Sequence, residues 1–312
     1  MVDTSVQHRD PDGKQFPHQE IRSHGRDRDE RSAAVAWSPD GRSLAIGSDG
    51  LAQIVEAATG KVFSRMAQGH SVLAVAWSPD GRSLAIGLYN GSARVFEVHS
   101  DREISKTEHG SPVTAVAWSS DGRWLAVGLG DASLLGEESG MARVVNAVTG
   151  TEVTRLTHDI PVVAVAWSAD GRLLATGSQG SIFFKSSGSA RIFDVATSSE
   201  VARVAQGRSV YSVAWSPVSP AVLTGSADGT ARLWRVFLTD EALVTAAKNR
   251  AARCLTQKQR QQFFLSAAPP TWCVERRLWP YHGDDWRAWL PLRKTWLANE
   301  RQGPEPMLPK EG

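Results

Sequence analysis

A phrase of fourteen residues returns five times along the chain. It reads AVAWSPDGRSLAIG at residues 34–47 and again at 74–87. Close variants are AVAWSSDGRWLAVG at 115–128, AVAWSADGRLLATG at 164–177 and SVAWSPVSPAVLTG at 212–225. The tryptophans of the phrase lie 40, 41, 49 and 48 residues apart. The chain is therefore an array of similar structural units, each of which has to pack against its neighbours.

The phrase predicts two strands joined by a tight turn. AVAW is a short apolar run, and the Ser-Pro-Asp-Gly after it favours a turn, because Pro39 presets its φ and Gly41 can take a positive φ. Asp-Gly or Asn-Gly pairs then predict a second hairpin. Third strands are expected at 52–55, 93–98 and 231–236, and fourth strands at 61–67 and 152–156.

AVAW carries no polar alternation, which indicates that both of its faces are buried between neighbouring sheets. Periods of roughly 40–45 residues with several strands each are typical of propeller blades. We therefore expect an all-β fold, a five-bladed β-propeller of four-stranded blades with a helical, Trp-rich C-terminal extension. The five repeating tryptophans are predicted to be structural core residues: Trp37, Trp77, Trp118, Trp167 and Trp215.

Residues 32–237 resemble the WD-repeat family. The resemblance rests on the SPDG turns, on the Gly69-His70 pair and on strands that end in an aromatic and then a polar residue, such as Phe96-Glu97. It implies four-stranded blades and a role in binding other proteins. No repeat keeps the Trp-Asp pair of the family, so its buried His–Asp–Ser–Trp hydrogen-bond network is not expected here.

Three segments are expected along the chain: a disordered leader at 1–18, the propeller at 19–237 and the helical extension at 238–312, which ends in a frayed terminus. Residues 20–24 are predicted to close the ring as the missing fourth strand of the fifth blade. Three alternatives stay open. The ring closes at five blades, the chain is the end of a longer sensor, or two chains share a ring.

Two matched insertions of about eight residues separate the second and third strands of the third and fourth repeats, at 129–140 and 178–189. The first is acidic, and the second holds an adjacent aromatic pair that would reduce solubility if it were fully exposed. We expect both to project from one face and to bind partners. The candidate partner-binding residues are Asp131, Leu134, Leu135, Glu137, Glu138, Phe183, Phe184 and Lys185. The alternative is a hairpin extension in which one phenylalanine covers its own blade.

From Thr239 the pattern becomes helical, with Thr239 and Thr256 as predicted N-caps. Residues 239–290 resemble the extension after the WD repeats of some bacterial signal-transduction and conflict-type proteins, where the propeller senses and another domain acts. Three tail tryptophans are expected to pack the tail onto the propeller: Trp272, Trp279 and Trp286. The tail from Phe237 holds 12 basic and 8 acidic residues, too small an excess to predict nucleic-acid binding.

The cysteines, the apolar segments and the motifs of the sequence limit the classes of function that the chain can have. Cys254 and Cys273 lack metal-ligand spacing and are expected to be reduced thiols in a cytoplasmic protein. The sequence has no long apolar segment that would predict a membrane span. It also shows no catalytic or phosphate-binding motif, so we expect neither an enzyme nor a cofactor or metal.

The sequence thus predicts a non-catalytic scaffold or sensor module that binds other proteins through the face carrying the two insertions. A propeller enzyme or small-ligand binder at the central channel is the alternative, and single-stranded nucleic-acid binding by the tail is a third. The oligomeric state is left open.

Overall fold

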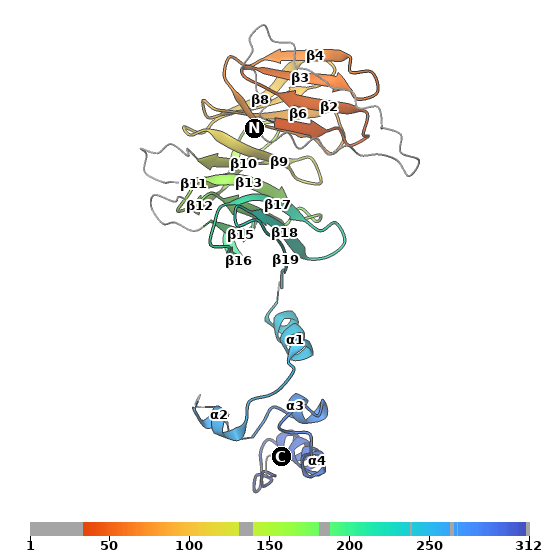
Figure 1. Ribbon diagram of the computed structural model, residues 1–312, viewed down its shortest axis with the longest axis vertical. Helices are drawn as coiled ribbons and strands as arrows, with labels where there is room; N and C mark the ends of the chain where they lie inside the picture. Colours follow the sequence, from red (N-terminus) through yellow and green to blue (C-terminus); the bar gives the residue numbers. More distant parts are fainter. Residues whose placement is uncertain are drawn as a thin grey trace. The chain divides into compact units, whose positions relative to one another are not determined.

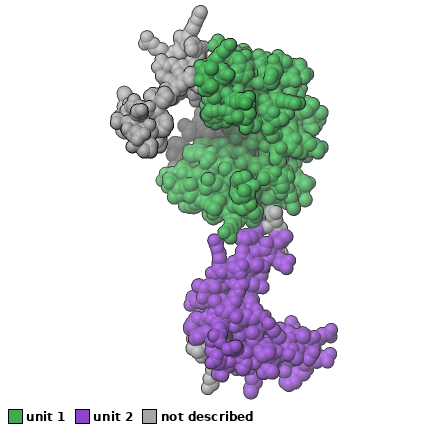
Figure 2. Space-filling view, turned by 90° about the vertical axis from the view of Figure 1, so that its right-hand side faces the viewer, with its two compact units in different colours: residues 1–236 green, residues 237–312 purple. Residues whose placement is uncertain are grey.

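The computed structural model describes residues 34–130, 140–180, 188–237, 239–262, 265–266 and 268–309. The chain divides into two compact units, Met1–Val236 and Phe237–Gly312, which Figure 2 shows in different colours. The described part of the first unit holds five antiparallel sheets, four with four strands and one with three. Each sheet is called a blade below, and the blades are numbered in chain order. Five sheets at the five phrases confirm the predicted number of repeats.

Every blade takes its strands in chain order. Blade 1 comprises β1 (Ala34–Trp37), β2 (Ser43–Gly47), β3 (Leu51–Glu56) and β4 (Val62–Ala67). Blade 2 comprises β5 (Val72–Trp77), β6 (Ser83–Leu88), β7 (Ser92–Glu97) and β8 (Arg102–Glu108). Blade 3 comprises β9 (Val113–Trp118), β10 (Trp124–Gly130), β11 (Gly140–Asn146) and β12 (Glu152–His158). Blade 4 comprises β13 (Val162–Trp167), β14 (Leu173–Ser178), β15 (Ser189–Asp194) and β16 (Ser199–Ala205). Blade 5 comprises β17 (Val210–Trp215), β18 (Ala221–Ser226) and β19 (Ala231–Arg235).

The Ser-Pro-Asp-Gly turns form as the sequence predicts. In blade 2 the Ser78 hydroxyl donates to Asp80 Oδ1 at 2.6 Å, and the same carboxylate oxygen accepts from the backbone N–H of Arg82 at 3.0 Å. Gly81 takes a φ of 70°, a conformation that costs a residue with a Cβ. Two side chains therefore satisfy the backbone of the turn without help from the rest of the molecule.

Glycine at the end of each second strand lets neighbouring blades approach. A Cβ on Gly47 would lie 2.4 Å from Val72 Cγ1 of blade 2, and one on Gly87 would lie 2.5 Å from Val113 Cγ1 of blade 3. Both valines are fully buried. A side chain at these glycines would push the next blade away, which explains why the phrase ends in Gly.

The blades pack on one another in chain order through their first strands, β1 on β5, β5 on β9, β9 on β13 and β13 on β17. No comparable packing joins blade 5 to blade 1 within residues 34–237 as described. Figure 1 places β2–β4 and β17–β19 at opposite ends of the array. The strand predicted at 20–24 lies outside the described residues, so ring closure by it stays a prediction.

The second unit has four described helices, α1 (Asp240–Arg250), α2 (Gln257–Gln262), α3 (Thr271–Glu275) and α4 (Asp284–Ala298). Both predicted caps are confirmed, since Thr239 Oγ1 accepts from Ala242 N at 3.1 Å and Thr256 Oγ1 from Gln259 N at 3.2 Å. None of the described helices is long and apolar enough to cross a membrane.

The prediction of reduced thiols is wrong. Cys254 and Cys273 form a disulfide, with their Cα atoms 6.2 Å apart. Both lie in the core of the second unit beside Trp286 and Trp289, which are almost fully buried. The fold of the tail brings the two thiols together, whereas their spacing in the sequence gives no sign of it.

Candidate functional site

The repeating tryptophans connect each blade to the one before it. The indole Nε1 of Trp118 donates to the backbone oxygen of Ala76 at 3.0 Å, and that of Trp167 donates to Ala117 at 3.0 Å. The same bond recurs between Trp77 and Ala36 at 3.2 Å and between Trp215 and Ala166 at 3.0 Å. In every case the acceptor is the residue that precedes the tryptophan of the earlier blade. The contact is therefore one interface used four times.

The prediction that all five tryptophans are buried core residues is wrong for Trp37. Trp167 is 9% exposed, and Trp77, Trp118 and Trp215 are partly buried against the clusters between blades. Trp37, in contrast, is 61% exposed. A tryptophan is buried by the blade before it, and no earlier blade lies beside β1 among the described residues.

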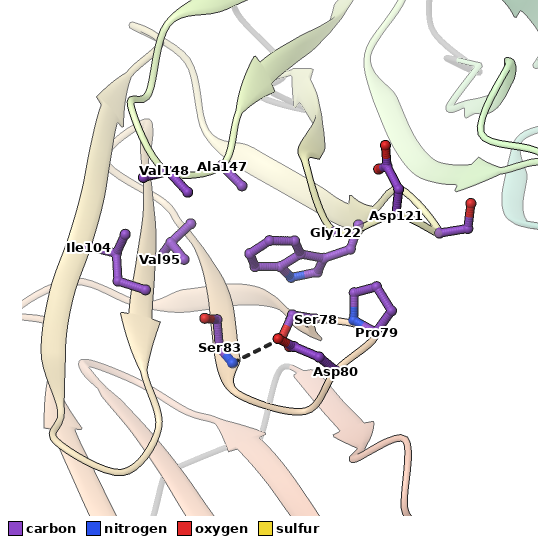
Figure 3. A pocket seen from close by; sticks show the side chains of 12 residues that line it. Ser78, Pro79, Asp80, Ser83, Val95, Ile104, Asp121, Gly122, Ala147 and Val148 are labelled. Carbon is purple, nitrogen blue, oxygen red and sulfur yellow. Dashed lines mark hydrogen bonds between the residues drawn. The ribbon is translucent and has the colours of Figure 1, made fainter.

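The indole of Trp118 also lines a cavity between two blades. Its hydrogen bond to the earlier blade fixes its position there. The cavity has a volume of about 470 Å³, and we call the indole of Trp118 the floor of this cavity. Figure 3 shows the lining from close by. One wall is the Ser78–Asp80 part of the turn of blade 2, and the other is the turn at Asp121 and Gly122. Apolar side chains of β7 and β8 and Val148, which is 66% exposed, complete the lining. We call this cavity notch 2.

A second cavity repeats notch 2 one blade earlier. Trp77 replaces Trp118, the Ser38–Asp40 turn replaces Ser78–Asp80, and Phe63 of β4 takes the place of an isoleucine of β8. Its volume is about 620 Å³, and we call it notch 1. Asp80 lines both notches, on opposite sides of its turn. The two notches therefore lie side by side on the same end of the blades.

The carboxylates of the notches are ionised at neutral pH. A hydrogen bond from the Ser78 hydroxyl lowers the pKa of Asp80, and the Arg82 backbone N–H acts in the same direction. The pKa of Asp121 is also lowered, through hydrogen bonds that outweigh its desolvation. Lys and Arg are missing from the described lining of notch 2. An aromatic floor between two carboxylates suits an apolar or cationic side chain of a partner.

These repeats match known family models. The model of the WD domain, G-beta repeat, matches residues 19–55, 102–135, 150–194 and 200–235. The model of the anaphase-promoting complex subunit 4 WD40 domain matches residues 62–112. The chain belongs to the WD-repeat family. No similar sequence was found among curated proteins. WD repeats generally serve as scaffolds for protein–protein interaction.

An arginine network occupies these WD-repeat blades where the His–Asp–Ser–Trp network of the family is incomplete. Arg94, Arg143 and Arg191 hold the same position in the third strands of blades 2, 3 and 4. Each lies within 4 Å of a glutamate at the start of its fourth strand, at 3.7, 3.3 and 3.8 Å. The recurrence of Arg after Ala in the third strands of blades 2 to 5 was the signal that could have found these pairs.

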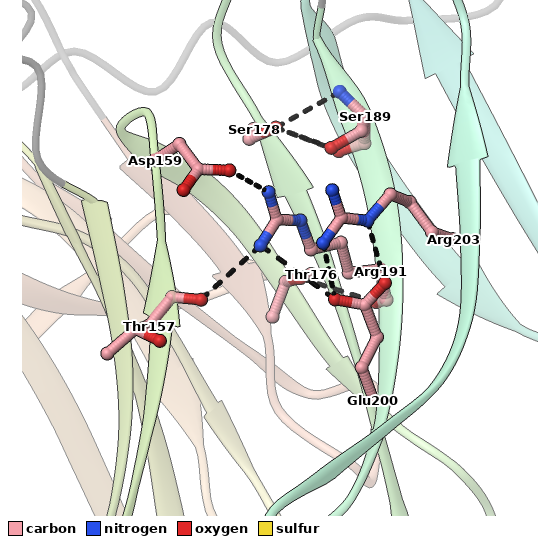
Figure 4. A network of polar contacts seen from close by, with 8 residues as sticks. All are labelled: Thr157, Asp159, Thr176, Ser178, Ser189, Arg191, Glu200 and Arg203. Carbon is pink, nitrogen blue, oxygen red and sulfur yellow. Dashed lines mark hydrogen bonds and ion pairs between the residues drawn. The ribbon is translucent and has the colours of Figure 1, made fainter.

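Blade 4 has the most buried member of this network (Figure 4). The Arg191 side chain is 7% exposed, and its Nη2 donates to Asp159 Oδ2 at 2.5 Å. Its Nη1 donates to the Thr157 carbonyl at 3.4 Å and lies 3.8 Å from Glu200, which Arg203 also pairs with at 2.7 Å. These contacts fix the outer strands of blades 3 and 4 to each other.

Two of the repeating histidines are buried beside these arginines. His158 is 6% exposed, neither ring nitrogen has a described partner, and its ring meets Phe193 edge to face at 5.4 Å. Burial, followed by the charge of Arg191, lowers the pKa of His158 to about 4. His109 has a pKa of about 4 for the same main reason, and its Nε2 lies 2.8 Å from Thr107 Oγ1. Both histidines are therefore neutral at pH 7.

The partner-binding residues predicted in the two insertions lie outside the described residues. The insertions connect β10 with β11 and β14 with β15, in blades that pack on each other. In an antiparallel blade, the connection between the second and third strands lies at the opposite end from the Ser-Pro-Asp-Gly turn. The strand ends that the insertions join therefore lie at the opposite end of the blades from the notches. Sequence reasoning missed the notches, because they form only when two blades meet.

The tail tryptophans have different environments within the second unit. Trp286 is 1% exposed in a cluster formed by residues of this unit, and Trp272 packs partly buried against it. Trp279 is 46% exposed, and its packing onto the propeller stays a prediction. Trp289, which the prediction omitted, is 2% exposed and meets Trp286 edge to face. Docking of this tail on the propeller stays a prediction.

No group of three or more His, Cys, Asp or Glu side chains that could hold a metal ion occurs among the residues that the structure describes. The aspartates of the repeated turns are engaged by hydroxyl and backbone donors of their own turn. Their role in the structure is to shape the turns that form the notch walls.

Proposed function

We propose that the chain is a non-catalytic interaction scaffold or sensor module that binds other proteins. One observation carries the proposal: a notch lined by a repeating tryptophan and by the aspartates of two successive turns occurs at two neighbouring blade boundaries, although notch 1 also has Arg82 and His99 in its lining. An extended partner segment that crosses the blades can insert a side chain into each notch. Carboxylates at the rims and the apolar floors favour segments in which Lys or Arg alternates with apolar residues.

The two insertions supply a second binding surface in this proposal. Their acidic and aromatic residues, Glu137, Glu138, Phe183 and Phe184 among them, are candidates for partner contact on the opposite face. Support comes from their attachment to adjacent blades, since β10 and β13 pack together. The sensor part of the proposal rests on the sequence of residues 239–290 alone, and in it a partner rather than this chain carries out the response.

Photo-crosslinking tests the notch surface. A benzoylphenylalanine at Val148, on the rim of notch 2, should crosslink to partner proteins in cells that express the full chain. The matched control is Val218, which is 91% exposed and does not line either notch. Trp118→Phe keeps the floor apolar, whereas Asp80→Lys puts a cation in place of the carboxylate that lines both notches and should abolish the crosslinks from Val148. Equal crosslinking from Val148 and Val218 would contradict a specific notch surface.

Deletion of the insertions tests the other face. Variants that lack residues 134–139 and 182–186 should lose partners that the intact chain captures, while the Val148 crosslinks persist. If the deleted and intact chains capture the same proteins in the same amounts, the insertions do not bind partners.

A further inference from the structure

The interface between consecutive blades has a constant design. The later blade contributes a Trp that donates to a backbone carbonyl and a Val that packs on a glycine of the earlier blade. Val165 Cγ1 would lie 3.3 Å from a Cβ on Gly128, and Val213 Cγ1 would lie 3.2 Å from one on Gly177. The earlier blade contributes a flat row of small and branched side chains, such as the fully buried pair Ala45 and Ile54.

Blade 1 presents the donor half of this interface, and no earlier blade covers it among the residues that the structure describes. Val35 is 68% exposed and Trp37 is 61% exposed. Their counterparts in blade 2, Val75 and Trp77, pack against the cluster shared with blade 1. Two neighbouring large apolar side chains on one strand face are costly to leave in water, and the indole N–H has no carbonyl of an earlier blade to bond.

Blade 5 presents the acceptor half, and no later blade covers it in the described part of the chain. Leu233 is 68% exposed, whereas Ile54, Val95, Val144 and Ile192 at the same register are at most 3% exposed. A Cβ on Gly225 would meet only Ser212 of its own blade, while the equivalent glycines meet a valine of the next blade.

The carbonyl that matches the four acceptors belongs to Ala214, the residue before Trp215. None of the described indoles donates to it. Blade 5 departs from the pattern at Ser212, where the other phrases have alanine, and at Leu223, 47% exposed, where the other blades carry a fully buried alanine. At Leu223 the uncovered face of blade 5 is therefore more apolar than its counterparts.

We propose that these two ends bind each other between copies of this chain. Blade 1 of one copy stacks on blade 5 of a second copy, Trp37 Nε1 donates to the Ala214 carbonyl, and Val35 covers Gly225. The continuity of the four internal contacts argues for this occupant, since the same chain carries both complementary halves. A contact between two different surfaces is heterologous, so the copies assemble head to tail into a ring or an open series.

Two variants that block opposite halves test the proposal on the full chain. Trp37→Asp removes the donor half and Leu233→Asp removes the acceptor half; both positions are exposed, so each variant is expected to fold. The wild type should form concentration-dependent oligomers in light scattering coupled to size exclusion. Each variant alone should be monomeric, with self-association weakened more than about tenfold, as expected for a central interface residue. Val218→Asp, the matched control at another exposed apolar position, should associate as the wild type does.

Mixing the two variants gives the decisive result. The intact Trp37 of the Leu233→Asp chain can dock on the intact blade 5 of the Trp37→Asp chain, so the mixture should form a 1:1 dimer that does not grow. Absence of this dimer would overturn the proposal. So would a monomeric wild type in which the Trp37 indole is protected from solvent, because that outcome means that blade 1 meets blade 5 of its own chain. The notch crosslinks do not depend on either outcome.

Discussion

The indole of Trp118 and the carbonyl of Ala76 are joined by a 3.0 Å hydrogen bond that crosses the boundary between two blades. The bond sets the position of the indole as the floor of notch 2 and holds blade 3 on blade 2. Stability and the candidate binding surface therefore depend on the same side chain.

Truncating this tryptophan should be costly, whereas truncating its counterpart in blade 1 should not. Trp118→Ala should lower the free energy of unfolding by about 3–5 kcal/mol, because a large side chain between blades is lost. Trp37→Ala should change it by less than about 1 kcal/mol, because Trp37 is 61% exposed. Urea denaturation followed by far-UV circular dichroism at low protein concentration measures both. Equal losses would mean that Trp37 is covered in the monomer.

Arg191 should stabilise the first unit more than an exposed arginine does. Arg191→Ala removes a buried side chain together with its contacts to Asp159 and Glu200, and it opens space in the site, so we expect a loss of about 2 kcal/mol. Arg155→Ala, which breaks a half-exposed pair with Glu152, should cost less than about 1 kcal/mol. Thermal melts of the two variants give the comparison. A smaller loss for Arg191 than for Arg155 would contradict the buried network.

The buried histidines predict a loss of stability on mild acidification. The folded pKa of His158 is about 4, below the value near 6.5 expected for the unfolded chain, so the unfolded chain binds more protons between these pH values. Stability should therefore fall as the pH drops from about 6.5 to about 4, by about 3 kcal/mol for each such histidine. NMR titration of the imidazole checks the pKa directly. His158→Phe should flatten the stability profile, and an unchanged profile would argue against this source.

The disulfide predicts a specific sensitivity of the second unit to reduction. It closes a loop of 19 residues, so Cys254→Ser should destabilise the helical unit by about 3 kcal/mol. Cys273→Ser should have the same effect, and the double variant should add little, because each single change already breaks the bond. Near-UV circular dichroism reports the tryptophans of this unit. Independent, additive losses would show that the cysteines act separately.

Much of the first unit was predictable from sequence because its determinants are local. The turn at Ser78–Gly81 needs only neighbouring side chains, and the caps Thr239 and Thr256 need only the first turn of their helices. The exposure of Trp37 was not predictable from its own fourteen-residue phrase, which is identical to that of the next repeat. Only its place at the beginning of the array distinguishes it.

The candidate site could not be predicted from the sequence of a single repeat, for a related reason. Notch 2 joins the turn of one blade to the tryptophan of the next, so no single repeat contains it. The pairing of Cys254 with Cys273 likewise depends on the packing of α3 against the preceding loop. The arginine pairs were predictable only in part. The recurrence of the arginines is visible in the sequence, whereas their partners are set by the register of the third and fourth strands.

The exchange of the tryptophan indole N–H protons with solvent tests the central claim most directly. Measured by NMR in the Leu233→Asp chain, with signals assigned by single Trp→Phe variants, the indoles of Trp77, Trp118, Trp167 and Trp215 should exchange slowly, and that of Trp37 should exchange at the rate of a free indole. Rapid exchange at Trp77 and Trp118, or protection at Trp37 equal to theirs, would contradict an array in which each blade is held only by the blade before it.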